Sequence, residues 1–114
     1  MQGKKHDAGK PLAGLLEQDF PRALKLVAEA ATYGAKKYNR SNWLLVPDAK
    51  TRYLDAKVRH QLEGNIQERD EESGLLHRAH EAWNCLALLE LEAKRLEAGS
   101  QEAKLLEAGS QESW

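Results

Sequence analysis

The chain has 114 residues, of which 41% are apolar and 31% charged, so we expect one small domain rather than two. Its 17 lysines and arginines nearly balance 18 aspartates and glutamates, and the formal charge of -1 excludes a global basic field that would draw it to nucleic acid or anionic lipid. The one cysteine, Cys85, excludes an internal disulfide and a thiolate zinc site.

Leucine, alanine, glutamate and lysine dominate the chain, and this composition favours helices over sheet. We therefore predict an all-α protein, a small bundle of three main helices that is completed by oligomerisation as a dimer or tetramer, because helices of this length leave apolar faces uncovered. The N-terminus lacks an apolar signal core and no apolar run could span a bilayer. These features predict a soluble cytoplasmic protein.

Residues 1–18 are polar and contain three glycines and a proline, which predicts an extended N-terminal arm or loop. A helical domain is predicted over residues 19–91. Its first helix is expected from Asp19, as N-cap, to about Lys37, with Pro21 in the first turn. Apolar residues recur along it at spacings near three and four, forming one stripe of Phe20, Leu24, Val27, Ala31 and Tyr38.

The asparagine- and serine-rich segment Asn39–Trp43 predicts a loop. A second helix is expected from about Asp48 to Glu63, where Gly64 and Asn65 stop it. The very polar residues 65–74 predict another loop. A third helix should start near Ser73 to Leu75 and run through Leu91, with an apolar side formed by Leu75, Ala79, Ala82, Leu86, Leu89 and Ala93.

The final segment, residues 92–114, contains a tandem decamer, Glu92–Gln101 followed by Glu102–Gln111. Two copies are too few for a solenoid. The alanine, leucine, glutamate and lysine content favours helix, while each Gly-Ser pair interrupts it. We expect either short helices, or an extension of the third helix that serves association, or a frayed solvated tail.

Polar residues gather on the two central helices at spacings that bring their side chains together. On the third helix one face carries His77, His80, Glu81 and Asn84, and Leu88 and Leu91 continue it, so its lower half is expected to be core and its upper half to line a pocket. On the second helix the neighbours are Asp55, Arg59, His60 and Glu63. Imidazoles and carboxylates on facing helices can converge on one divalent ion, to which the acidic loop could add oxygen ligands from Asp70 and Glu72. Structural histidines and a solvated acidic loop are the simpler alternative.

A small basic patch of Lys36, Lys37 and Arg40 lies beside Tyr38 and Trp43 in the sequence. Basic side chains beside aromatic rings are compatible with phosphate and base contacts, although aromatic residues at helical spacing more often fill a core. The chain contains no Walker A loop and no Gly-x-Gly-x-x-Gly motif. P-loop hydrolysis and dinucleotide redox chemistry are therefore poorly supported.

Several sequence blocks carry a resemblance to a known family. In chain order they are His6-Asp7-Ala8-Gly9-Lys10-Pro11, Tyr33-Gly34-Ala35-Lys36-Lys37-Tyr38 before Asn42-Trp43, Arg59-His60, Asp70-Glu71-Glu72-Ser73-Gly74-Leu75-Leu76-His77-Arg78-Ala79-His80, and Asn84. They resemble the phage-associated dATP/dGTP diphosphohydrolases, whose chemistry is related to the all-α nucleotide pyrophosphohydrolases of the MazG type. The decamer repeat lies outside the resemblance.

The resemblance implies hydrolysis of a purine deoxynucleoside triphosphate to monophosphate and pyrophosphate, assisted by Mg²⁺ or a similar ion such as Mn²⁺. It implies catalytic roles for Glu63, Asp70, Glu72, His77 and His80. The implied metal ligands are His60, Glu63, Asp70, His77 and His80. The implied phosphate contacts are Lys10, Lys36, Lys37 and Arg59, and the base and sugar contacts are Tyr38, Asn42, Trp43 and Asn84.

Two departures from the family pattern are visible. The Arg-His helix leads into Gly64-Asn65 rather than a Gly-Glu pair, which predicts a different pocket wall. The paired carboxylates of the better-known pyrophosphohydrolases are replaced by His60-x-x-Glu63 and His77-x-x-His80, which would shift preference from Mg²⁺ toward softer ions. A nucleotide-sequestering protein without catalysis and a helical assembly module are the alternative functions. A phage origin would place the protein in the host bacterial cytoplasm, with no membrane or nucleic-acid partner.

Overall fold

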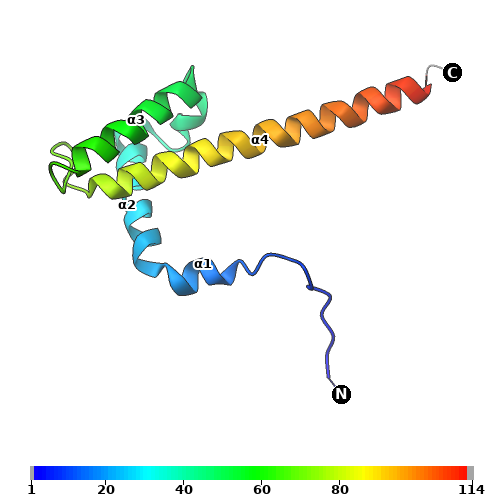
Figure 1. Ribbon diagram of the computed structural model, residues 1–114, viewed down its shortest axis with the longest axis horizontal. Helices are drawn as coiled ribbons and strands as arrows, with labels where there is room; N and C mark the ends of the chain where they lie inside the picture. The colour runs from blue at the N-terminus through cyan, green and yellow to red at the C-terminus, as the bar shows by residue number, and fades with distance from the viewer. Residues whose placement is uncertain (1, 113–114) are drawn as a thin grey trace.

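In the computed structural model, which describes residues 2–112, the chain is all-α, as predicted, and that span contains no strand. The elements in order are α1 (Gly14–Asp19), α2 (Pro21–Tyr38), the 3-10 turn η1 (Asn42–Leu45), α3 (Ala49–Gly64) and α4 (His77–Glu112). Both α3 and α2 pack against α4, and α1 packs against α2 (Figure 1). The site described below lies where α2, α3 and the first turns of α4 meet.

The N-terminal segment corrects two expectations. Residues 14–19 form a short helix instead of continuing the arm, and Asp19 ends that helix, so Phe20 rather than Asp19 precedes the first turn of α2. Pro21 stands at the start of α2 as predicted, because a residue without an N–H loses no hydrogen bond there. The arm before α1 runs away from α3 and α4 (Figure 1).

The start of α4 corrects a third expectation. The helix begins at His77 rather than near Ser73 to Leu75, because the residues before it are bonded across the loop. The backbone N–H of Asp70 donates to the carbonyl of Leu75 at 2.8 Å, and that of His77 donates to the carbonyl of Glu68 at 3.0 Å. Gly74 adopts a φ of 74°, which favours glycine, and closes this turn.

The decamer repeat continues α4 without a break, so the segment extends the third helix rather than forming separate short helices. Gly99 and Ser100 stay helical because the surrounding alanines, leucines and glutamates offset the roughly 1 kcal/mol that glycine costs in a helix. Side chains from residue 92 to 109 are exposed. This half of α4 projects beyond the other helices (Figure 1).

Among the described side chains, the buried apolar residues are small: Ala30, Ala79 and Ala87. On the predicted apolar side of the third helix the large residues are exposed, at 51% for Leu86 and 65% for Leu89, while Ala79 is buried. The face that begins with His77 points inward, as expected, and His77 and Asn84 are buried on it.

The chain is extended for its size. Its radius of gyration is 19.6 Å, whereas a compact domain of this length has about 13 Å. The apolar stripe predicted along the first helix is also open, with Phe20 and Tyr38 each 55% exposed. Over the described residues, no helix is both long and apolar enough to cross a membrane.

Candidate functional site

Four side chains that could bind a metal ion lie close together where a loop connects the end of α3 to the start of α4. One ligand atom from each lies within 4.8 Å of all the others. The four residues are His60, Glu63, Asp70 and His77. The helical spacing of three brings His60 and Glu63 onto one face of α3, the loop supplies Asp70, and the first residue of α4 supplies His77.

The two histidines of this cluster are buried, at 7% exposed for His60 and 3% for His77. Their Nδ1 atoms are 2.9 Å apart, and His77 Nδ1 lies 3.8 Å from a carboxylate oxygen of Glu63. Neighbouring ligand atoms of an octahedral ion with bonds of about 2.1 Å lie roughly 3 Å apart. The two imidazoles and two carboxylates therefore fit a divalent ion in both spacing and chemistry.

Burial and charge keep His60 neutral. Burial, followed by repulsion from His80 and Arg59, lowers the pKa of His60 from 6.5 to about 4. A metal ligand must offer an unprotonated nitrogen, so at neutral pH this imidazole needs to release no proton before it binds an ion.

The carboxyl group of Asp70, in the loop, is also kept deprotonated, which is the form that binds a metal ion. Burial alone would raise its pKa, but the N–H and hydroxyl of Ser73 stabilise the carboxylate and lower the pKa below its ordinary value. The Ser73 N–H donates to Asp70 Oδ2 at 2.8 Å. The carboxylate is therefore charged across the neutral range.

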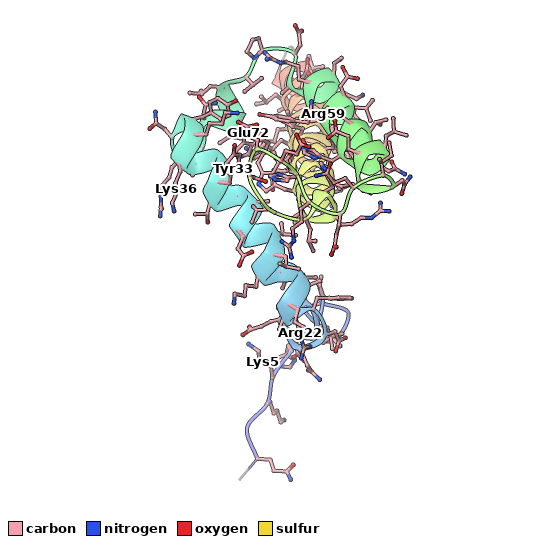
Figure 2. All side chains as sticks on the ribbon, turned by 90° about the vertical axis from the view of Figure 1, so that its left-hand side faces the viewer. Lys5, Arg22, Tyr33, Lys36, Arg59 and Glu72 are labelled. Atoms are coloured by element: carbon pink, nitrogen blue, oxygen red, sulfur yellow. The ribbon has the colours of Figure 1, made fainter. Side chains whose placement is uncertain are left out.

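Two of the predicted catalytic residues lie outside the cluster. His80 is bonded to Ser73 instead, with 2.7 Å between its Nε2 and the serine Oγ. Glu72 is exposed and pairs with Lys37 of α2, and this hydrogen bond, followed by one from Tyr33, lowers its pKa. Figure 2 shows Glu72 next to Tyr33 and Arg59 on the opposite side of the site.

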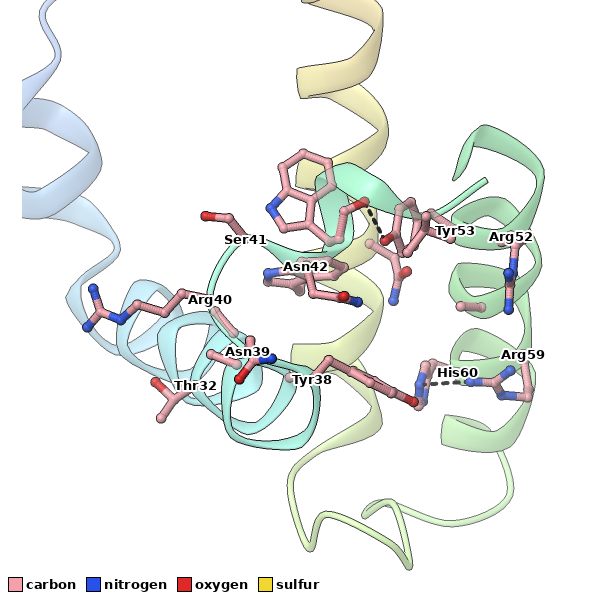
Figure 3. A pocket seen from close by; sticks show the side chains of 18 residues that line it. Thr32, Tyr38, Asn39, Arg40, Ser41, Asn42, Arg52, Tyr53, Arg59 and His60 are labelled. Atoms are coloured by element: carbon pink, nitrogen blue, oxygen red, sulfur yellow. Dashed lines mark hydrogen bonds between the residues drawn. The ribbon is translucent and has the colours of Figure 1, made fainter. Parts of the chain in front are cut away.

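A pocket of about 760 Å³ opens between α2, the loop that follows it, α3 and α4. His60 belongs to both the pocket and the metal-ligating cluster. Beside it, an Arg59 guanidinium nitrogen lies 3.5 Å from His60 Nε2. Figure 3 shows Tyr38 pointing across the pocket toward these two residues. The pocket thus ends at the cluster.

The other end of the pocket is aromatic. Trp43, Tyr53 and Trp83 meet edge to face with ring centroids 5.6 to 6.0 Å apart, and the Tyr53 hydroxyl donates to the carbonyl of Trp43 at 2.8 Å. The connecting loop adopts positive φ at Asn39 (98°) and Ser41 (60°), both of which line the pocket. Such angles are uncommon for residues with a side chain, and they concentrate at binding sites.

The pocket gathers five of the eight predicted substrate-binding residues: Tyr38, Asn42, Trp43, Arg59 and Asn84. The other three lie elsewhere. Lys37 is held by Glu72, Lys36 is exposed outside the pocket, and Lys10 lies in the N-terminal arm, whose Lys5 Figure 2 shows far from Arg59.

Sequence reasoning missed three contributors to the site. Arg52 and Tyr53 line the pocket about two turns before His60, so the helical period of α3 could have revealed them. Ser73 could not be found in this way, because its role depends on the turn that the loop makes.

Comparison with known proteins adds two likenesses. Residues 1–101 match the family model described as dATP/dGTP diphosphohydrolase, N-terminal. A dATP/dGTP diphosphohydrolase of Salmonella phage PMBT28 is 40% identical over 83 residues, which is 72% of this chain and 27% of that relative. The chain therefore spans about a quarter of the relative's length. No solved structure matches the chain.

Proposed function

The chain belongs to the dATP/dGTP diphosphohydrolase family, in the N-terminal part that the family model describes, and from this membership we propose that it hydrolyses purine deoxynucleoside triphosphates to monophosphate and pyrophosphate with a divalent ion. The observation that carries the proposal is the shared residue His60, which joins a set of metal-ligating side chains to a pocket of nucleotide size. Mg²⁺ is the expected ion, and the two imidazoles also suit Mn²⁺.

The phosphates have matching donors in the arginines that line the pocket. Arg59 stands beside His60, and Arg40 and Arg52 also line the pocket. Guanidinium groups suit phosphate oxygens because they donate two parallel, charge-assisted hydrogen bonds. In this arrangement the arginines take the place expected from sequence for Lys36 and Lys37.

The base has aromatic and amide partners among the side chains that line the pocket. Tyr38 and Trp43 offer rings on which a purine can stack. Asn84 is buried, and its amide nitrogen donates to the carbonyl of His80 at 2.8 Å. Its Oδ1 is thereby left as an acceptor, which suits the exocyclic amine of a purine or a sugar hydroxyl.

Glu63 is the carboxylate best placed to meet an attacking water, because its side chain is 47% exposed while the histidines around it are buried. A divalent ion in this cluster would supply Lewis-acid stabilisation of the negative charge that develops on the phosphates. Asp70 is held by Ser73 and His77 is buried, so these candidate ligands are already ordered, and ordered groups save free energy in the transition state.

The test is to incubate the protein with each deoxynucleoside triphosphate and Mg²⁺ or Mn²⁺, and to separate the products by chromatography. We expect monophosphate and pyrophosphate from dATP and dGTP. His77→Ala should reduce turnover by at least about a hundredfold. Removing a group that only hydrogen-bonds to a metal ligand costs about 10- to 100-fold in activity, and removing the ligand itself should cost more. Gln101→Ala, at an exposed helical position of the decamer repeat, is the control and should keep wild-type turnover. Nucleotide that is retained but unchanged would instead identify a sequestering protein.

A further inference from the structure

The contacts of His80 distinguish it from the histidines of the metal-ligating cluster. Its ring lies parallel to that of His60, with centroids 4.6 Å apart and 15° between the planes. Its Nε2 is bonded to the Ser73 hydroxyl. On its other side the Tyr33 ring meets it edge to face at 6.0 Å. Turning His80 toward the cluster would break these contacts.

Ser73 connects His80 to the loop ligand. Its backbone N–H donates to Asp70 Oδ2, and its Oγ accepts the N–H of Leu75 at 3.1 Å. The hydroxyl has a single hydrogen, which goes either to the Asp70 carboxylate or to His80 Nε2, and the tautomer of His80 decides which of the two it is. Ser73 is thus fixed from three sides.

We propose that His80 and Ser73 are positioning residues that hold two of the four candidate ligands, Asp70 through the serine and His60 through the stacked ring, and that His80 does not itself bind the ion. The inference rests on the metal site proposed above. Asp70 is the ligand that most needs this support, because it lies in the loop between α3 and α4 rather than on a helix.

The magnitude expected for such a role is known from other metal sites. Groups that orient ligands without touching the metal commonly change metal affinity by about 10- to 100-fold when they are removed. Since the serine and the histidine act through one hydrogen bond, removing either should have nearly the same effect as removing both.

The test is to measure Mn²⁺ dissociation constants by titration calorimetry for the full chain and four variants, together with the visible absorption of bound Co²⁺. Ser73→Ala and His80→Phe should each weaken Mn²⁺ binding about 10- to 100-fold, and the double variant should be no weaker than the poorer single one. His80→Phe keeps a ring to stack on His60. Ser73→Thr, which keeps the hydroxyl, should stay close to the wild-type affinity. At saturation the Co²⁺ bands should be unchanged in all four variants, because the ligand set is the same.

Three results would overturn the inference. Co²⁺ bands that change in His80→Phe but not in Ser73→Ala would make His80 a ligand. Losses that add in the double variant would show that the two side chains do not act together. Equal Mn²⁺ affinity in Ser73→Ala and Ser73→Thr would show that the hydroxyl has no role, and this comparison stands even if His80→Phe does not fold. Failure of the wild-type chain to bind Mn²⁺ or Co²⁺ is a separate outcome that removes the proposed metal site itself.

Discussion

At the scale of single residues, His60 links the two halves of the site because both of its ring nitrogens have neighbours. Nδ1 faces His77 within the metal-ligating cluster, and Nε2 faces Arg59 in the pocket. Any change at this imidazole therefore acts on the proposed metal site and on the pocket together.

The lowered pKa of His60 predicts a loss of stability in acid. Between pH 6.5 and about 4 the unfolded chain binds a proton at this residue that the folded chain does not, so the free energy of unfolding falls as the pH falls through that window. The contribution of His60 is at most about 3 kcal/mol. Urea unfolding of the metal-free protein across this range measures it. His60→Gln, which cannot titrate, should show a flatter profile, and an identical profile would contradict the prediction.

Helical periodicity was sufficient to place His60 and Glu63 on one face of α3, because spacing along a helix fixes which face a side chain occupies. It failed for Glu72 and Ser73. Their positions depend on a distant lysine and on a turn, and neither leaves a periodic signal in the sequence. That the gathered residues act as catalytic and metal-binding groups stays a prediction.

At the scale of elements, the close approach of α3 and α4 depends on the glycine that ends α3. A Cβ added at Gly64 would lie 3.1 Å from the Cβ of His77, which is tighter than most contacts of this kind. Gly64→Ala should therefore push His77 by a few tenths of an ångström and weaken Mn²⁺ binding about tenfold, although no ligand is removed.

Gly99→Ala is the matched control for this prediction. Gly99 is also helical, and a Cβ there would meet no atom within 4 Å. This variant should gain up to about 1 kcal/mol of helix stability without changing Mn²⁺ affinity. Calorimetry and thermal melting of both variants make the comparison. Equal Mn²⁺ affinities would show that the packing at Gly64 does not position His77.

The sequence predicted elements best where they are long. The second helix was expected from about Asp48 to Glu63 and is observed as Ala49–Gly64. The six-residue α1 was missed because one and a half turns are too short for a periodic pattern. The start of α4 was placed too early because Ser73 and Gly74 resemble a helix start in sequence, whereas their hydrogen bonds close a loop.

At the scale of the whole molecule, the exposed leucines predict association of this chain with further copies of itself. On α3 a stripe at spacings of four is open to solvent, at Leu54 (45%), Val58 (40%) and Leu62 (60%). Burying such a stripe between copies would lower the free energy by roughly 25 cal/mol for each Å² of apolar surface removed from water.

Sedimentation at micromolar concentration should therefore give a dimer or tetramer. Leu62→Lys should shift the distribution toward monomer, because it places a charge within the stripe. Gln61→Lys, at the adjacent polar position of the same helix, adds the same charge outside the stripe and should leave the distribution unchanged. A stable wild-type monomer would contradict the expectation that oligomerisation completes the bundle.

Composition and charge predicted the all-α class but not the shape. Leu86 and Leu89, on the predicted apolar side of the third helix, are exposed, whereas His77 and Asn84, on the face expected to form core and pocket, are buried and bonded to His60 and to the backbone. A hydrophobic pattern alone does not distinguish a helix face that packs inside one chain from a helix face that packs against another copy of the chain. The predicted division of the chain into an arm, a helical domain and a tail, with boundaries at residues 18 and 91, likewise stays a prediction. The helix α4 runs through the second of these boundaries without a break.

The position of the four candidate ligands also affects the stability of the hairpin formed by α3 and α4. Glu63 lies in the last turn of α3, His77 opens α4, and Asp70 lies in the loop that joins them. An ion bound there would be a cross-link at the base of a hairpin whose interior contains little apolar surface. By linkage, each tenfold rise in free ion above its dissociation constant adds about 1.4 kcal/mol to the stability of the folded chain. Cellular metal supply would then control the amount of folded protein as well as its chemistry.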